Sequence, residues 1–87
     1  MDSSDNVTTD NPFITYDIGL AASLVTLGYK LIDVDKSNPR KSQFMFNRDE
    51  QTEKMVNKYW DDSLTLPARS FVDNLKMLKN RLYSIVD

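Results

Sequence analysis

The sequence lacks cysteine and histidine altogether. Without cysteine, disulfides and thiolate metal sites are excluded. Without histidine, the chain has neither the commonest general base nor the commonest zinc ligand, and its serines have no imidazole to activate them. The two glycines, Gly19 and Gly28, do not form a phosphate-binding loop. We therefore expect no catalytic residues, no metal site and no cofactor, and we interpret the protein as a non-enzyme.

Long hydrophobic runs are also absent. The longest segment without a charge, Ile18–Tyr29, has twelve residues, whereas a membrane-spanning helix needs about 20. The residues before it carry Asp2, Asp5 and Asp10, and a secretory signal peptide begins with basic residues instead. The sequence therefore predicts no membrane association and a cytoplasmic location.

The distribution of charge divides the chain into two parts. Residues 1–11 contain three aspartates and no lysine or arginine, a composition typical of a disordered acidic tail. Residues 12–87 contain 11 basic and 10 acidic side chains, and their length suits a single small domain. Because this domain is nearly neutral, strong non-specific binding to DNA is not expected.

The hydrophobic pattern predicts an α+β fold, in which a small sheet packs with three helices in the order β-α-β-β-α-α. The sheet consists of a β-hairpin and a third, N-terminal strand at Phe13–Tyr16, which is expected to run parallel to the second strand through a right-handed crossover. The other expected elements are a helix capped by Asp17 and ended by Gly28, strands at Tyr29–Asp35 and Ser42–Phe46 with a turn at Lys36–Lys41, a helix opened by a capping box of Asn47 and Glu50, and a helix that starts at Pro67.

The hairpin is expected to pair Val34 near Phe44 and Ile32 near Phe46, which places all four side chains on the core side of the sheet. The opposite face of the sheet then carries two further apolar residues, Leu31 and Met45.

The first helix has two different apolar faces and no charged face. Leu20, Leu24 and Leu27 form a bulky stripe at helical spacing, which is expected to lie on the sheet. The other face consists of small side chains, namely Gly19, Ala22, Ser23 and Thr26. Two alternatives remain for this small-residue face. Either the C-terminal helices cover it, or it binds a partner chain, such as a second copy in a homodimer.

The second and third helices each show one apolar stripe. The two stripes consist of Thr52, Met55, Val56, Tyr59 and Trp60, and of Phe71, Leu75, Leu78, Leu82 and Ile85. Tyr59 and Trp60 are a second candidate surface for a protein partner, because large aromatic side chains are enriched at interfaces. The alternative interpretation is that Trp60 belongs to the core.

Basic residues suggest nucleic-acid binding as an alternative function. Lys36, Arg40 and Lys41 lie at the hairpin turn and are the candidate contacts. Phe44 and Phe46 would stack on bases if their sheet face were open, and they are core residues if it is covered. A second basic group lies on the third helix and comprises Arg69, Lys76, Lys79 and Arg81.

Carboxylates near the second strand raise the question of a metal-dependent nuclease. Asp33 and Asp35 alternate along this strand, with Asp17 expected across the sheet, and spaced carboxylates can hold Mg²⁺. However, Lys36 follows Asp35 directly, where nuclease motifs place a spacer. We therefore interpret Asp33 and Asp35 as a solvent-exposed strand face.

The chain resembles a family of short domains that occur mainly in phage and prophage genomes and have no assigned function. The residues that carry this resemblance are Thr15–Ala22, Leu24, Gly28, the lysine-leucine pair at 30–31, Phe44–Phe46, Tyr59–Trp60, Phe71 and Leu75–Lys76. The resemblance covers Phe13–Tyr83. It implies a phage or prophage origin and a small free-standing domain, and it supplies no catalytic residues.

Together these observations predict a small phage-type accessory protein that acts by binding another protein in the host cytoplasm. The expected roles are a host-factor inhibitor, a regulator or a minor component of a larger assembly. The alternative is a regulator that binds nucleic acid through the basic hairpin turn.

Overall fold

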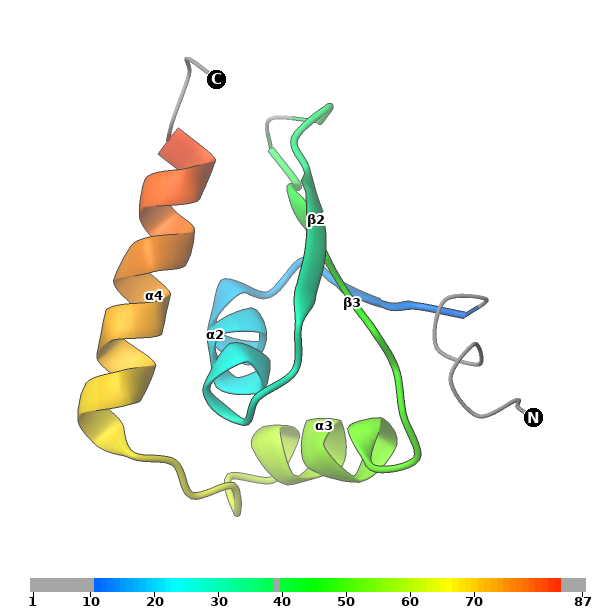
Figure 1. The fold of residues 1–87 in the computed structure, drawn as a ribbon, viewed down its shortest axis with the longest axis vertical. Helices are drawn as coiled ribbons and strands as arrows, with labels where there is room; N and C mark the ends of the chain where they lie inside the picture. Colours follow the sequence, from blue (N-terminus) through cyan, green and yellow to red (C-terminus); the bar gives the residue numbers. More distant parts are fainter. Residues whose placement is uncertain (1–10, 39, 84–87) are drawn as a thin grey trace.

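The computed structural model describes residues 11–38 and 40–83. Their order, β-α-β-β-α-α, confirms the predicted α+β fold (Figure 1). The elements are β1 (Phe13–Thr15), α2 (Ile18–Thr26), β2 (Leu31–Asp35), β3 (Gln43–Phe46), α3 (Thr52–Trp60) and α4 (Ala68–Tyr83). Most of the predicted acidic tail, residues 1–10, and the predicted core residue Ile85 lie outside the described residues. Asn11 is described, and its carbonyl accepts a hydrogen bond from Arg48 Nε at 3.0 Å.

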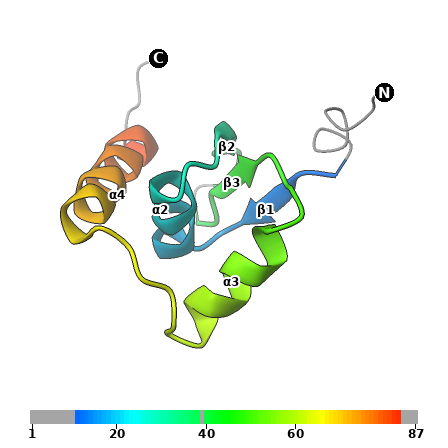
Figure 2. The same ribbon diagram turned by 60° about the horizontal axis from the view of Figure 1, so that its bottom comes forward.

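The three strands form one antiparallel sheet in the order β1-β3-β2. In the β1–β3 pair, Phe13 lies opposite Phe46 and Thr15 lies opposite Phe44. β1 and β2 therefore run in the same direction, as predicted, but β3 separates them. The reason is that the hairpin leaves one edge of β3 without a partner, and β1 takes that edge (Figure 2).

The register of the hairpin agrees with the prediction at one end and departs from it at the other. Val34 pairs with Phe44, as expected. Phe46, however, pairs with Leu31 and not with Ile32, because a bulge follows Leu31. A bulge places two residues of one strand opposite one residue of its partner and changes the facing of the side chains beyond it. Leu31 consequently packs against the core, and Ile32 is 44% exposed.

The other face of the sheet carries Ile14 and Met45, which lie opposite each other on β1 and β3. Met45 lies on this face between the buried Phe44 and Phe46, which confirms its predicted side. Ile14 is 43% exposed.

Helix α2 lies between α4 and the sheet, and the three layers follow one another in Figures 1 and 2. Leu20 and Leu24 are buried against the sheet residues Phe44 and Phe46, and Leu78 of α4 joins the same cluster. Leu27 is partly buried against this cluster. The predicted packing of the bulky face of α2 is therefore confirmed.

The ends of α2 and α4 follow the local sequence signals. Asp17 caps α2, since its Oδ1 accepts the Leu20 N–H at 3.0 Å. Gly28 ends α2 with a φ of 103°, a conformation that glycine adopts without a steric penalty. At the start of α4, the Pro67 carbonyl accepts the Phe71 N–H at 3.0 Å.

The predicted capping box of α3 is wrong. The helix starts at Thr52, and the turn before it is held by Asp49 in place of Asn47 and Glu50. Asp49 Oδ1 accepts hydrogen bonds from the Gln51 N–H at 2.8 Å and from the Tyr29 hydroxyl at 2.8 Å. The Tyr29 hydroxyl reaches Asp49 from the end of α2, a tertiary contact that local spacing does not reveal.

Candidate functional site

The small-residue face of α2 is covered from within the chain. Ala22 is 0% exposed and Ser23 is 1% exposed. Thr26 Oγ1 accepts a hydrogen bond at 3.0 Å from Asn74 Nδ2 of α4. At Gly19, an added Cβ would stand 2.6 Å from the Tyr59 hydroxyl oxygen of α3. Of the two alternatives, the structure therefore favours the first, cover by the C-terminal helices.

Tyr59 fixes the end of α3 to the start of α2. Its hydroxyl donates to Asp17 Oδ1 at 3.4 Å, and the same oxygen caps α2 by accepting the Leu20 N–H. Burial raises the pKa of the Tyr59 hydroxyl above its ordinary value, and the nearby Asp17 carboxylate adds to the rise. Tyr59, one of the two residues of the predicted aromatic surface, thus has a structural role.

Trp60, in contrast, lies on the surface with 60% of its area exposed, so its interpretation as a core residue is wrong. Its ring meets the Tyr59 ring edge to face, with 5.0 Å between the centroids. Eight residues of α-helix turn Trp60 by about 80° away from Thr52, the one fully buried residue of α3. Trp60, the last residue of the predicted apolar stripe, therefore lies outside the core.

A cleft of about 220 Å³ opens beside Tyr59, between α3 and α4. Its walls come from α2, α3, the segment that connects α3 to α4, and α4 itself, and we call it the α3–α4 cleft. The lining residues are Ser23, Tyr59, Asp62, Leu64, Leu66, Ala68 and Phe71. The hydrophobic pattern assigns Leu64–Leu66 to neither the second nor the third predicted helix. The two leucines, alternating with exposed Thr65, were a signal that one side of this segment packs inward.

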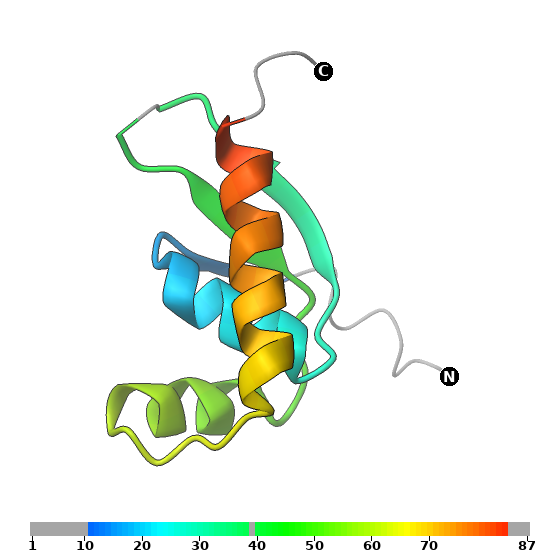
Figure 3. The same cartoon turned by 90° about the vertical axis from the view of Figure 1, so that its left-hand side faces the viewer.

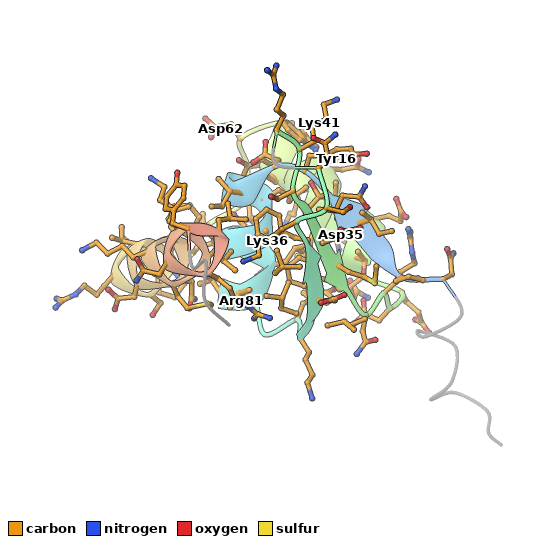
Figure 4. All side chains as sticks on the ribbon, turned by 90° about the horizontal axis from the view of Figure 1, so that it is seen from above. Tyr16, Asp35, Lys36, Lys41, Asp62 and Arg81 are labelled. Carbon is orange, nitrogen blue, oxygen red and sulfur yellow. The ribbon has the colours of Figure 1, made fainter. Side chains whose placement is uncertain are left out.

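Asp62 stands at the rim of the α3–α4 cleft in an unusual backbone conformation. Its φ is 64°, the left-handed region that glycine normally occupies directly after a helix. The turn is held by hydrogen bonds from the Asp62 N–H to the Tyr59 carbonyl at 3.2 Å and from the Ser63 N–H to the Lys58 carbonyl at 2.9 Å. Within the described residues, the Asp62 carboxylate makes no hydrogen bond or ion pair. Figure 4 shows Asp62 at the outer margin of the molecule.

The predicted basic residues of the hairpin turn have contacts of their own. Lys36 Nζ donates to the Arg81 carbonyl of α4 at 3.1 Å, which is favourable because the last turn of a helix carries partial negative charge. Lys41 Nζ lies 5.2 Å from the centre of the Tyr16 ring. Arg40 is exposed. Figure 4 shows both groupings, Lys36 beside Arg81 and Lys41 beside Tyr16.

The two phenylalanines of β3 do not form a stacking surface. Phe44 is 1% exposed and Phe46 is 0% exposed, so the core interpretation is confirmed and the stacking interpretation is wrong. Any contact with bases would have to use other side chains.

The acidic residues of β2 serve the local turn. Asp33 Oδ1 accepts the Val34 N–H at 2.9 Å, and Asp35 Oδ1 accepts the Ser37 N–H at 2.9 Å. Hydrogen bonds from the Ser37 backbone and, to a smaller extent, from the Ser37 side chain lower the pKa of the Asp35 carboxyl below its ordinary value. Among the described residues, no three acidic side chains come together in a way that could hold a metal ion. Nor does any described helix combine the length and hydrophobicity of a membrane span.

The fold and the cleft together define a small α+β domain with an open apolar cleft beside an exposed tryptophan. Residues 10–84 match a protein family, and the chain belongs to it: the family is described as a domain of unknown function, DUF5659. Comparisons with curated proteins and with solved structures find no match.

Proposed function

We propose that this domain acts by binding another protein through Trp60 and the α3–α4 cleft. The observation that carries the proposal is the 60% exposure of Trp60, the single tryptophan of the chain. Tryptophan is enriched among the residues that dominate binding energy at interfaces. Trp60 contacts Tyr59, and Tyr59 lines the α3–α4 cleft, so Tyr59 links the exposed ring to the cleft.

The role that fits this surface is an accessory protein without catalysis, acting in the host cytoplasm as a host-factor inhibitor, a regulator or a minor component of a larger assembly. The phage or prophage origin implied by the sequence resemblance is part of this proposal. A small domain without catalysis can act by occupying a surface of its partner.

An affinity capture with matched variants tests this function. The tagged protein, Trp60→Ala and Tyr83→Ala are each incubated with lysate of the cell in which the protein is made, after nuclease treatment. Tyr83 is the control because it is 75% exposed and lies at the opposite end of the molecule from α3 (Figure 1). We expect the wild type and Tyr83→Ala to retain the same partner and Trp60→Ala to lose it. Equal capture by all three contradicts the proposal.

Nucleic-acid binding is a second candidate, favoured by one contact. The hydrogen bond from Lys36 Nζ to the Arg81 carbonyl brings the basic residues of the hairpin turn close to those of α4. Figures 1 and 3 show the hairpin turn beside the C-terminal end of α4. The α4 helix carries four basic residues and one acidic residue, Asp73. A basic patch of this kind is what phosphate backbones contact.

Fluorescence anisotropy with a labelled oligonucleotide separates the two candidates. Arg40→Glu and Lys41→Glu should abolish binding, and the wild type should bind more weakly as salt rises. Lys54→Glu, the same charge reversal on exposed α3, is the control and should bind like the wild type. A wild type that does not bind at low salt removes this candidate.

A further inference from the structure

We infer that the α3–α4 cleft recognises a large apolar side chain together with an adjacent cationic group, as in a partner segment where a leucine or similar residue neighbours lysine or arginine. This inference rests on the proposed function and names the chemistry of the partner. The apolar group would lie on the leucines and Phe71, and the cation would meet the Asp62 carboxylate at the rim.

The first argument is the chemistry of the cleft walls. Leu64, Leu66 and Phe71 are each partly buried, so they present apolar surface without being closed off. A volume of about 220 Å³ accommodates one large side chain and falls short of the 300–1,000 Å³ typical of drug-sized ligands. The cleft therefore suits an anchoring side chain of a larger partner.

The second argument is charge complementarity. None of the residues that line the cleft is basic, and Asp62 contributes one negative charge. Because no described residue pairs with the Asp62 carboxylate, a bound cation would gain an interaction without breaking an existing ion pair. The Tyr59 hydroxyl already donates its hydrogen to Asp17, so towards a ligand its oxygen can only accept a hydrogen bond. This again favours a donor such as an ammonium or guanidinium group.

The third argument is the backbone position of Asp62. Aspartate is one of the few residues with a side chain that enter the left-handed region, but the turn after α3 is one in which glycine is the usual residue. The carboxylate therefore stands where the fold alone would favour glycine. A binding role for the carboxylate gives this position a physical reason.

The experiment uses small probes in place of the unidentified partner. Hexylguanidinium, hexanol and hexanoate share one apolar tail and carry a positive, neutral and negative head group. Each is titrated into the ¹⁵N-labelled full chain, and amide shifts are followed at Asp62, Leu64 and Leu66. We expect all three amides to shift with hexylguanidinium, which should bind about two- to fivefold more tightly than hexanol, the range for an exposed charge interaction. Hexanoate should bind more weakly than hexanol.

Matched variants assign the charge preference. Asp62→Asn keeps a residue that tolerates the left-handed conformation but removes the charge, so hexylguanidinium and hexanol should then bind equally. Asp61→Asn is the control: it makes the same change of net charge one residue away, where the carboxylate already accepts a hydrogen bond from Ser63 Oγ at 2.7 Å. It should keep the preference. Asp62→Gly, which relieves the backbone strain, should raise thermal stability and lose the preference.

Three outcomes overturn the inference: no shifts at the cleft amides, no preference for the cation, or an equal loss of preference in Asp61→Asn and Asp62→Asn. These outcomes are distinct from failure of the proposed function. If affinity capture finds no partner but the cation preference holds, the cleft chemistry stands and the protein-binding role falls. If a Trp60-dependent partner is found but the probes ignore the cleft, the role stands and this inference falls.

Discussion

Helices α2 and α3 have nine residues each, yet they relate to the core very differently. Five residues of α2 are buried, from Leu20 to Leu24, whereas Thr52 is the one buried residue of α3. The difference follows from position: α2 lies between α4 and the sheet, and α3 lies at the margin of the domain (Figure 2). An element enclosed on two sides contributes most of its length to the core, and an element at the margin leaves most of its surface exposed.

The largest expected effect comes from the core side of α2. Leu24 is 0% exposed, so Leu24→Ala removes buried contacts and leaves a cavity. We expect a loss of about 2–5 kcal/mol in the free energy of unfolding, measured by urea denaturation followed by circular dichroism. Because small domains have a total of about 5–15 kcal/mol, this variant would be close to unfolding. A loss below about 1 kcal/mol would contradict the packing of α2 described above.

The next prediction compares the two helices directly. Ala22→Leu overpacks a residue that is 0% exposed and should cost about 1–3 kcal/mol. Trp60→Ala removes a mostly exposed ring and should change the stability by no more than about 0.5 kcal/mol. Both are measured by urea denaturation, with sedimentation velocity to record the oligomeric state. If Ala22→Leu folds normally and only changes the oligomeric state, the small-residue face is an interface after all.

A smaller effect is expected where the two helices touch. In a helix, alanine is about 1 kcal/mol more favourable than glycine, but Gly19→Ala places a Cβ 2.6 Å from the Tyr59 hydroxyl oxygen. The substitution should therefore fail to stabilise the wild type. In Tyr59→Phe the hydroxyl is gone, and the closest remaining neighbours of the added Cβ are Asp17 Oδ1 at 3.2 Å and the ring atom Cζ at 3.7 Å. There Gly19→Ala should be less unfavourable than in the wild type, with a coupling of about 1 kcal/mol in a double-mutant cycle. The same effect in both backgrounds would rule out this contact.

The smallest effect concerns acid stability at the start of α3. Burial alone would raise the pKa of Asp49, but hydrogen bonds from Tyr29, Gln51 and Thr52 outweigh it and lower the pKa. A carboxyl with a lowered folded-state pKa stabilises the fold above the ordinary aspartate pKa of about 3.9, and this contribution is lost as the pH falls through the folded-state pKa. Asp49→Asn should flatten the acid side of the stability profile, and Tyr29→Phe should flatten it in part. Unchanged profiles in both variants would show that these hydrogen bonds do not stabilise the fold.

The features that the sequence predicted well are those set by neighbouring residues. The Asp17 cap and the end of α2 at Gly28 depend on residues within about one turn of each other. The order of elements followed from the hydrophobic pattern of each segment. The bulky face of α2 was also predictable, because helical periodicity and the absence of charge both required burial. The absence of charge indicated that the small-residue face of α2 is also covered, but not by which element. The structure shows that α3 and α4 cover it.

The features that were missed depend on tertiary contacts. The bulge after Leu31 moved Ile32 to the surface, and no residue of the strand announces it. Asp49 takes the place of the expected capping box, and it also accepts a hydrogen bond from the Tyr29 hydroxyl, which lies in the segment between α2 and β2. Trp60 matched a core stripe by spacing, but α3 ends there and nothing in its local sequence indicates which flank stays open. The α3–α4 cleft is built from four segments, so spacing within any one of them could not predict it.

The contrast between a closed α2 and an open end of α3 can be tested with the protein's own fluorescence, because Trp60 is its single tryptophan. Acrylamide quenching of the isolated domain, repeated over a range of protein concentrations, measures how freely solvent reaches this ring. We predict strong quenching that is the same at every concentration, with emission typical of a water-exposed indole. Emission from an apolar environment, with weak quenching at all concentrations, would mean that Trp60 is buried in the domain and would contradict the account.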